Sequence, residues 1–522
     1  MKGIKYKISI FFFLTTIGIS SVYAYNLCQA RNVTYSPKDT SWNVSNVQEA
    51  ISDLYKTKCG GANSCGDIAE PKLYDDDAFI PVTIDDDGTV RYADTSTNWY
   101  DYCEKRWANA VMLNKYISIS SNVEPGKITI DTANSDIGYV NIDDENRFEE
   151  IPKYKPGEII KESDIQSYFV WIPKYKYKLW NVNSDGKSTG ITKGVHSIDI
   201  VFDKTNTTDV EGESCATPLG SGETGNCNNG EYMTHPAFIS DGVDGFWVAK
   251  FEASDADKIY QDDDSTQNQI NLERGVSAKP NHVSKTSIKI QVMFETAYNY
   301  ARLMDSHMMK NTEWGAVAYL SHSKYGINKK ININNSKPKL TGASALPNTN
   351  QQTYPGTSGE GEKYYNLYNT NIGYLASTTG NITGVYDMSG GAQEYVAAYV
   401  DTKFSSSGFT AATAANYDAK YFDIYNKSSN TTNYQYRILG DATAEVGPFK
   451  SFIDNDGDTT ATTTNSRYHS EWYRGGAEFA TTSSSWFIRG NRSENGVLAS
   501  QFSFQRNTGA ANVNMGYRLV LD

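Results

Sequence analysis

Cysteine and histidine are the side chains best suited to covalent or metal chemistry, and the chain contains six of each. The histidines are scattered without the spacing of metal ligands, and no Cys-x-x-Cys pair occurs. Two local pairs, Cys59 with Cys65 and Cys215 with Cys227, would each close a short loop rich in Gly and Asn. Because the cysteine count is even, these four thiols are predicted to form disulfides if the chain is exported.

Carboxylates are the second group of candidate ligands. Aspartates cluster at 75–77 and 85–87, and Asp454-Asn455-Asp456-Gly457-Asp458 is a further candidate for calcium. In this last segment the glycine does not stand where an EF-hand loop requires it, and the distal glutamate of such a loop is missing. The run Asp85-Asp86-Asp87-Gly88 predicts a hairpin turn, because Asp-Gly by itself supplies the backbone geometry of a tight turn.

The C-terminal segment 474–522 combines residues that are expected to fix the backbone with intervening positions that carry side chains of every kind. Its glycines allow tight turns, and aromatic residues such as Trp486 and Phe502 provide buried anchors. Between them lie side chains of mixed character, which supply apolar contact and hydrogen bonding without a catalytic constellation. The candidate ligand-binding residues are Ile488, Arg492, Ser493, Glu494, Leu498, Ser500, Ser503, Gln505, Arg506, Val513 and Met515.

Several upstream elements are expected to position this segment. β-Branched and aromatic runs predict strands at 81–83, 99–102, 107–111 and 168–173. Apolar residues at helical spacing predict a helix around 294–301 and another over 312–320, with Asn311 as its N-cap.

The tail itself should add strands to this scaffold. Phe502-Ser503-Phe504 fits a half-buried strand, and Met515 to Asp522 fits a terminal strand buried on both faces. Arg489 and Arg518 belong to the frame, where we expect them to be buried and paired with carboxylates such as Glu394 or Glu471.

The N-terminus predicts export. Three lysines precede the apolar run Ile8–Ile19, and Val22-Tyr23-Ala24 has the small-residue ending that signal peptidase accepts. Residues 1–24 are therefore predicted to be a signal peptide or a retained signal anchor, and the protein to be secreted or displayed on a bacterial cell surface. No second membrane segment follows, so any membrane contact would come through this segment.

The length and net charge of the chain limit its domain count and the classes of partner that it can bind. The chain has 522 residues and a net charge of −13, which argues against a nucleic-acid partner because phosphate binding needs a basic face.

Residues 25–66 contain one short amphipathic helix, at about 45–55, and a Gly-rich linker. The main domain is predicted to span 67–522, with polar loop insertions at about 203–230, 327–365 and 401–435.

The order of the motifs resembles that of the formylglycine-generating enzyme, or sulfatase-modifying factor, family. The matching blocks are GFWVAKFEAS (245–254), TEWGAVAYL (312–320), GVYDMSGGAQEYV (384–396), RGG (474–476) and GYRLVL (516–521). The resemblance covers about residues 160 to 522. It implies an α+β, loop-rich, C-type-lectin-like fold, here preceded by a short helical stalk.

The catalytic part of that family pattern is missing. Members that oxidise a substrate cysteine carry two cysteines shortly after the RGG block, whereas no cysteine follows Cys227 in this chain. The family's calcium-associated motif is also altered, with Gly391 and Gln393 at two of its positions. Glu394 remains as a candidate calcium ligand, and calcium is the one cofactor that the resemblance leaves open.

The tail is similar to a narrower group as well, the variable proteins of diversity-generating retroelements, in which mutable residues sit on a fixed scaffold. This resemblance implies a non-catalytic surface protein that binds a protein or glycan ligand on a cell or phage. Two alternatives remain open at this stage: an enzyme of the same superfamily that uses other chemistry, and a structural envelope protein without a specific ligand.

Overall fold

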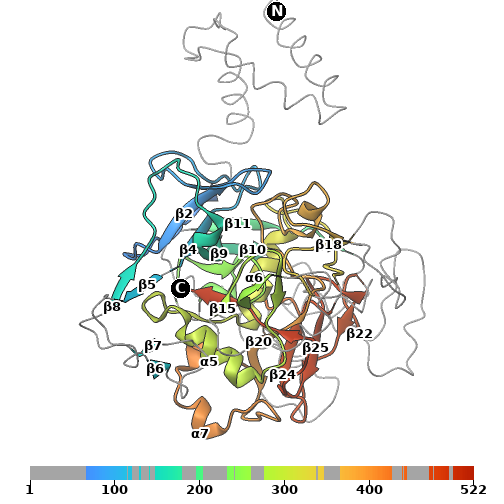
Figure 1. Ribbon diagram of the computed structural model, residues 1–522. Helices are drawn as coiled ribbons and strands as arrows, with labels where there is room; N and C mark the ends of the chain where they lie inside the picture. The colour runs from blue at the N-terminus through green and yellow to red at the C-terminus, as the bar shows by residue number, and fades with distance from the viewer. Residues whose placement is uncertain are drawn as a thin grey trace, which may run out of the picture. The chain divides into compact units, whose positions relative to one another are not determined.

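The computed structural model describes residues 66–114, 116–119, 129–130, 140–141, 147–178, 195–203, 232–239, 242–259, 276–336, 339–345, 365–425, 438, 440–443, 469–473, 475–492 and 498–522. The chain divides after Gly66 into two units, and the described residues other than Gly66 belong to the second, Asp67–Asp522. This unit is a loop-rich α+β structure with few helices and several mainly antiparallel sheets, as the sequence predicts (Figure 1). The expected helix near 45–55 lies outside the described residues.

Seven strands form what we call the first sheet, in the order β17–β27–β13–β9–β4–β2–β3, each antiparallel to its neighbour. The sheet therefore joins strands from the start of the described residues to the last strand of the chain. The predicted strands at 81–83, 107–111 and 168–173 are confirmed, with ends that differ from the predicted ones by at most three residues. The strands are β2 (Phe79–Ile84), β3 (Val90–Tyr92), β4 (Asn109–Leu113), β9 (Ile165–Pro173), β13 (Gly245–Ala249), β17 (His307–Met308) and β27 (Leu519–Leu521).

Large aromatic residues fill the interior against this sheet. Trp171 on β9 and Trp247 on β13 are cross-strand partners, and their ring centroids lie 5.3 Å apart. Phe79 on β2 packs against Trp247 at 5.4 Å. All three side chains are buried, so they contribute strongly to the apolar area that folding removes from water.

The predicted turn between β2 and β3 is confirmed. The Asp85 N–H donates to the Thr89 carbonyl at 2.9 Å, and the Gly88 N–H donates to the Asp85 carbonyl at 2.8 Å. Gly88 has a φ of +91°, a conformation that other residues adopt only with strain. The aspartates of this segment thus serve a hairpin.

A second sheet carries most of the C-terminal segment. Its order is β21–β20–β24–β25–β23–β22, and β26 pairs with β20 as well. β21 and β26 are parallel to β20, whereas β24 is antiparallel to it. The strands are β20 (Gln393–Val400), β21 (Asp423–Tyr425), β22 (His469–Ser470), β23 (Gly476–Ala477), β24 (Trp486–Arg489), β25 (Phe504–Asn507) and β26 (Met515–Gly516).

Two of the helices are those that the sequence predicts. Helix α5 (Ile290–Tyr300) packs against β17, and α6 (Asn311–Ser321) is buried along its whole length. The predicted N-cap is wrong by one residue, because Asn311 is already helical and Lys310 precedes the helix. Two carboxylates satisfy N–H groups at the start of the helix: Glu313, in its own first turn, accepts from the Lys310 N–H, and Asp423 of β21 accepts from the Thr312 N–H.

Arg518 connects the two sheets. Its guanidinium donates to both carboxylate oxygens of Glu394 on β20, at 2.6 and 3.0 Å. It also donates to the Ala249 carbonyl on β13 at 2.8 Å and to the Tyr386 carbonyl at 2.9 Å. Both charged side chains are almost completely buried, so the predicted structural pairing of Arg518 with Glu394 is confirmed.

Arg489 is also buried, as the sequence predicts, but its expected pairing with a carboxylate is wrong, because its described hydrogen bonds go to neutral oxygens. Its guanidinium donates to Asn311 Oδ1 and to the Asp441 carbonyl, each at 3.2 Å. It therefore fixes the start of α6 against β24.

Two strand predictions need correction. Residues 99–102 form no strand, since only Asp101 makes an isolated bridge, to Arg106, and Lys105 takes a left-handed turn between them. Phe502 precedes β25, because the Ser503 N–H donates to the Ser500 carbonyl in a turn. The terminal strand is confirmed as buried on both faces, although it is interrupted between β26 and β27.

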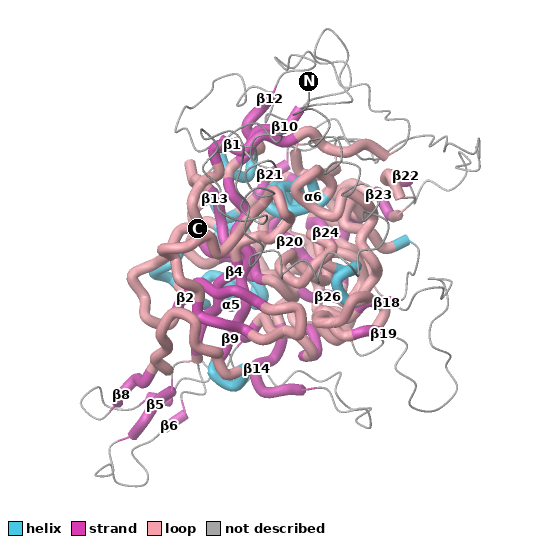
Figure 2. The backbone as a smooth tube through the Cα atoms, turned by 90° about the horizontal axis from the view of Figure 1, so that it is seen from above, coloured by secondary structure: helices cyan, strands magenta, loops and turns pink. Residues whose placement is uncertain are grey.

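The remaining elements are short. They are β1 (Gly66–Asp67), β5 (Tyr116–Ile119), β6 (Thr129–Ile130), β7 (Val140–Asn141), β8 (Arg147–Glu150), β10 (Tyr175–Lys178), β11 (Ile200–Asp203), β12 (Tyr232–Thr234), β14 (Ser254–Ile259), β15 (Val276–Ser277), β16 (His282–Ser284), β18 (Ser344–Ala345), β19 (Tyr365–Asn366), the helix α7 (Ala411–Ala414) and the 3-10 turns η4 (Glu162–Asp164), η5 (Pro236–Phe238), η6 (Arg302–Met304), η7 (Gly373–Ala376) and η8 (Ala419–Tyr421). Loops connect them throughout (Figure 2).

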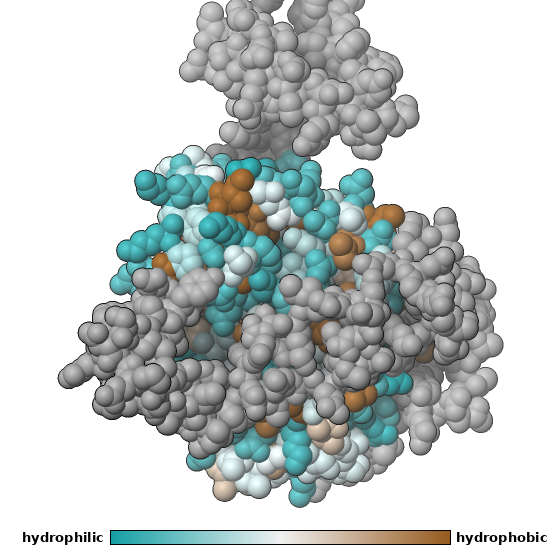
Figure 3. All heavy atoms as spheres, viewed as in Figure 1, coloured by the Kyte–Doolittle hydropathy of each residue, from teal (hydrophilic) through white to brown (hydrophobic). Residues whose placement is uncertain are grey.

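The described surface is mainly hydrophilic in the view of Figure 3, with apolar side chains scattered over it. Within the described part of the chain, no helix has both the length and the apolar character needed to cross a bilayer.

Candidate functional site

The C-terminal segment places several predicted binding residues on one face of the second sheet. The register aligns Tyr395 with Ile488, Ile488 with Gln505, and Gln393 with Met515. Cross-strand partners share a face, so these five side chains lie together. Asn507, two residues after Gln505 on β25, lies on the same face. We call Gln393, Tyr395, Ile488, Gln505, Asn507 and Met515 the tail face.

Hydrogen bonds between side chains fix the polar groups of the tail face. Gln393 Nε2 donates to Asn491 Oδ1 at 3.0 Å and to Gln505 Oε1 at 3.2 Å. The Tyr395 hydroxyl lies 2.7 Å from Asn507 Oδ1. Groups held in this way are positioned before any ligand arrives, which lowers the entropy that binding must overcome.

Exposure separates the predicted binding residues into two sets. Leu498 and Val513 are 43% and 49% exposed, and Arg492, Gln505 and Arg506 are half-buried. These five can meet a ligand at the surface. Ser493 and Glu494 lie outside the described residues.

The expectation that Ile488 and Met515 are exposed is wrong. Their side chains are only 3% and 5% exposed, and they form the apolar floor of the tail face. Ser500 and Ser503 are also buried and serve local structure: Ser500 Oγ accepts from the Phe502 N–H, and Ser503 Oγ donates to the Gly476 carbonyl.

Arg506 does not belong to the tail face. It is the cross-strand partner of Phe487, which lies on the opposite side of the sheet from Ile488. Its guanidinium lies 2.6 Å from a carboxylate oxygen of Glu478.

At Glu394, the candidate calcium ligand, neither carboxylate oxygen is free. Both oxygens of Glu394 accept hydrogen bonds from Arg518, so a guanidinium occupies the position that the cation would take. Burial raises the pKa of Glu394 to about 7 even though Arg518 favours the ionised form. The Asp454–Asp458 segment lies outside the described residues.

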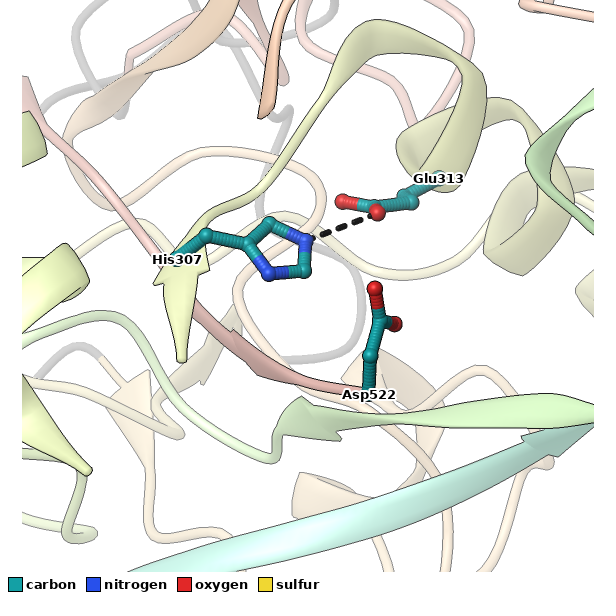
Figure 4. A group of neighbouring side chains, drawn as sticks. All are labelled: His307, Glu313 and Asp522. Carbon is teal, nitrogen blue, oxygen red and sulfur yellow. Dashed lines mark hydrogen bonds and ion pairs between the residues drawn. The ribbon is translucent and has the colours of Figure 1, made fainter. Parts of the chain in front are cut away.

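Among the described residues, His307, Glu313 and Asp522 form the one group with the composition of a metal site. One ring nitrogen and two carboxylate oxygens lie within 4.8 Å of one another, and Figure 4 shows the three side chains converging. All three are buried. The spacing of these residues does not predict the group, because Asp522 lies more than two hundred residues from His307 along the chain.

The contacts of His307 identify the group as an ion-pair network. Nδ1 lies 2.9 Å from the Asp305 carbonyl and Nε2 lies 2.9 Å from Glu313 Oε1, so both ring nitrogens face acceptors. A ring with two acceptors carries two protons and has no lone pair for a metal. Lys310 Nζ, 3.2 Å from the same Glu313 oxygen, adds a second positive charge.

The pKa values agree with this assignment. Burial alone would lower the pKa of His307, but the carboxylates of Glu313 and Asp522 outweigh burial and raise it to about 9. Burial opposes ionisation of Glu313 too, yet Lys310 and His307 lower its pKa to about 2.

Three of the other described histidines, His235, His282 and His322, are also engaged in structural contacts. His235 is buried, its Nε2 lies 2.7 Å from the Gly440 carbonyl, and burial lowers its pKa to about 3. His282 Nδ1 contacts the Pro280 carbonyl at 2.8 Å, and His322 Nε2 contacts the Tyr473 hydroxyl. None of these rings is among the residues of the tail face.

Cys103, which the sequence left unassigned, is disulfide-bonded. Its partner lies outside the described residues, as do Cys59, Cys65, Cys215 and Cys227. The two local disulfides predicted from spacing therefore stay predictions.

No protein-family model matches the chain, and no curated protein matches it.

Proposed function

We propose that the protein is an exported surface protein that binds a protein or glycan ligand through the exposed and half-buried residues of its C-terminal segment. The scaffold in this proposal is a formylglycine-generating-enzyme-type, C-type-lectin-like fold without catalytic function. The observation that carries the proposal is the exposure of Leu498 and Val513, together with the half-buried Arg492, Gln505 and Asn507, on segments that the second sheet holds in place. A rigid sheet with preset amides and exposed neighbouring loops is suited to recognition.

The chemistry of the chain supports a non-catalytic role. No cysteine follows Cys227, so the thiolate pair that binds copper in the related oxidases has no counterpart in the tail. The buried titratable group at His307 is an ion-pair network with a protonated ring, and it offers neither a base nor a free metal ligand.

Export is supported by two observations of different kinds. The first 24 residues have the pattern of a signal segment. Cys103 is disulfide-bonded, a state that persists in oxidising compartments outside the cytoplasm. At the bacterial surface, a recognition face of this type would meet other cells or phages.

Truncation of the exposed residues tests the proposal. We expect the combined substitutions Arg492→Ala, Leu498→Ala and Val513→Ala to weaken binding to target cells by tenfold or more, because such side chains supply the contact area of a binding face. Binding of labelled protein to a panel of bacteria and phages, read by flow cytometry, would measure the effect.

Leu303→Ala is the matched control, since Leu303 is 97% exposed and comes from η6 rather than from the tail. The triple variant and the control should melt at the same temperature. Equal binding by the triple variant and the wild type would contradict the proposal, and stoichiometric copper or iron in the purified protein would favour an enzyme.

Diversification of the tail is a separate part of the proposal. We expect the source locus to contain a near-copy of the segment encoding residues 474–522, next to a reverse transcriptase gene. Differences confined to adenines of the template would support a diversified binding face, and a locus without the near-copy would leave a fixed binding protein.

A further inference from the structure

Lys250 and Asn109 face each other in the core, on one face of the first sheet. Asn109 begins β4 and Lys250 directly follows β13, with β9 between the two strands. The register aligns Asn109 and Val248 with the same residue of β9, Val170, so Lys250, two residues after Val248, shares the face of Asn109. The lysine side chain crosses β9 on this face, and its Nζ lies 2.9 Å from Asn109 Oδ1.

Lys250 is buried without a counter-ion among the described residues. Its side chain is 0% exposed, and the described acceptors of Nζ are two neutral oxygens, Asn109 Oδ1 and the Gly384 carbonyl, each at 2.9 Å. Burial lowers the pKa of the Lys250 amine well below its ordinary value. A neutral amine has two hydrogens, which match the two acceptors, and one lone pair, which makes it a nucleophile.

Backbone carbonyls fix the orientation of the Asn109 carboxamide. Its Nδ2 donates to the Trp107 carbonyl and to the Thr383 carbonyl, each at 2.9 Å. A carbonyl can only accept, so these two contacts identify the nitrogen and leave Oδ1 facing Lys250.

The carbonyl carbon of Asn109 is therefore close to the amine. A C=O bond is about 1.23 Å long, so Lys250 Nζ lies no farther than about 4.1 Å from Asn109 Cγ. Reacting atoms need a separation of about 3–3.5 Å, so a shift of about 1 Å is enough, with a rotation about the Cε–Nζ bond to turn the lone pair toward Cγ.

From this arrangement we infer that Lys250 and Asn109 become joined by an isopeptide bond. Nζ attacks Cγ and forms the new C–N bond, and the Cγ–Nδ2 bond breaks. One Nζ hydrogen passes to Nδ2, so ammonia is the leaving group and the step needs no oxidant or other reactant. The remaining N–H of the new amide keeps its hydrogen bond to the Gly384 carbonyl.

The burial of both groups favours this reaction. Two groups held in contact react as if at an effective concentration of about 10⁵–10⁸ M, which offsets the low reactivity of a carboxamide. Asn109 is only 2% exposed, so water that would compete for Cγ is excluded. The released ammonia diffuses into the solvent, which makes the reverse step negligible.

The bond would link β4 to β13 across β9 and close the chain between residues 109 and 250. A cross-link over so long a loop removes conformational freedom from the unfolded chain. Unlike a disulfide, it survives reducing agents. It gives the scaffold a permanent link that does not depend on which ligand the C-terminal segment binds.

The intact mass of the full chain, measured after reduction and denaturation, tests the inference. We expect the wild type to be lighter by one ammonia than the mass of its sequence from the observed N-terminus. After digestion, the peptides that contain residues 109 and 250 should be recovered as one branched species. Lys250→Met should have its full sequence mass and yield the two peptides separately, because it has no amine to react.

Lys279→Met is the matched control, since Lys279 is also largely buried, at 8% exposed, but is paired with Glu162. This variant should keep the mass deficit and the branched peptide. A wild type of full sequence mass would overturn the inference. So would a deficit that persists in Lys250→Met, because an asparagine would then have lost ammonia to its own backbone as a succinimide. The branched peptide is read from the wild type itself, so the result does not depend on how well a variant folds.

Discussion

Replacing Arg518 with leucine is expected to lower the free energy of unfolding by roughly 3–5 kcal/mol, the usual effect of removing one partner of a buried ion pair. The substitution would leave the buried Glu394 carboxyl without its two hydrogen-bond donors. It would also leave the Ala249 and Tyr386 carbonyls without the guanidinium that links the two sheets. Urea unfolding, followed by tryptophan fluorescence, would measure the loss.

Two further variants identify the cause of that effect. Arg506→Leu removes the half-buried partner of Glu478 and should cost less than Arg518→Leu, because the side chains of this pair are 27% and 21% exposed and keep contact with water. The double variant Arg518→Leu with Glu394→Leu removes both buried charges and should recover part of the stability lost in the single variant. A cost below about 1 kcal/mol for Arg518→Leu alone would show that the pair does not hold the sheets together.

Alkaline pH is expected to destabilise the protein through His307. The pKa of His307 is about 9 in the folded protein, against 6.5 for an ordinary histidine. A raised folded pKa gives stability that is fully present below about pH 6.5 and is lost as the pH rises through 9. At about 1.36 kcal/mol per unit of pKa difference, the loss is roughly 3 kcal/mol in total.

Between about pH 6.5 and 9, the carboxylate that contacts His307 directly keeps its charge. The pKa of Glu313 is held near 2 by Lys310 and His307, and so Glu313 stays ionised. Asp423, which also faces Lys310, has a pKa raised by burial to about 7, so its own contribution is lost at the lower end of the range.

Comparison with a His307→Gln variant isolates the histidine. Glutamine can still donate a hydrogen bond to Glu313 but does not titrate, so its unfolding free energy should be nearly level between about pH 7.5 and 9.5, while that of the wild type falls. Parallel curves for the two proteins would show that His307 is not a protonated partner of Glu313. Zinc should not raise the melting temperature of the wild type, since a doubly protonated ring cannot bind it.

Part of the candidate site was predictable, because it follows from local pattern. The Phe502-Ser503-Phe504 alternation predicts a strand, which begins two residues later as β25, and neighbouring strands place every second residue on a shared face. Which residues share it was not predictable, since that depends on register. The register places Gln505 on the tail face and Arg506 on the reverse, and it buries Ile488 and Met515, for which the sequence favoured exposure.

Gln393 and Asn491 show what sequence reasoning missed. Gln393 was noted only as a departure from the calcium motif, and Asn491 was not singled out. A signal did exist, since amide side chains recur at 393, 491, 505 and 507 in segments expected to lie near one another. Their connection still required the pairing of β20 with β24 and of β24 with β25.

The sequence by itself determined the features that a few neighbouring residues control. The Asp85–Gly88 turn, the strand at 168–173, helices α5 and α6, and the burial of Arg518 follow from local backbone preference, apolar spacing and residue type. Tertiary structure alone decided the protonation of His307 and the hydrogen bonds that join Gln393 to Asn491 and Gln505. Both depend on atoms from segments far apart in the chain, held at hydrogen-bond distance where water is excluded, and only the folded chain brings such atoms together.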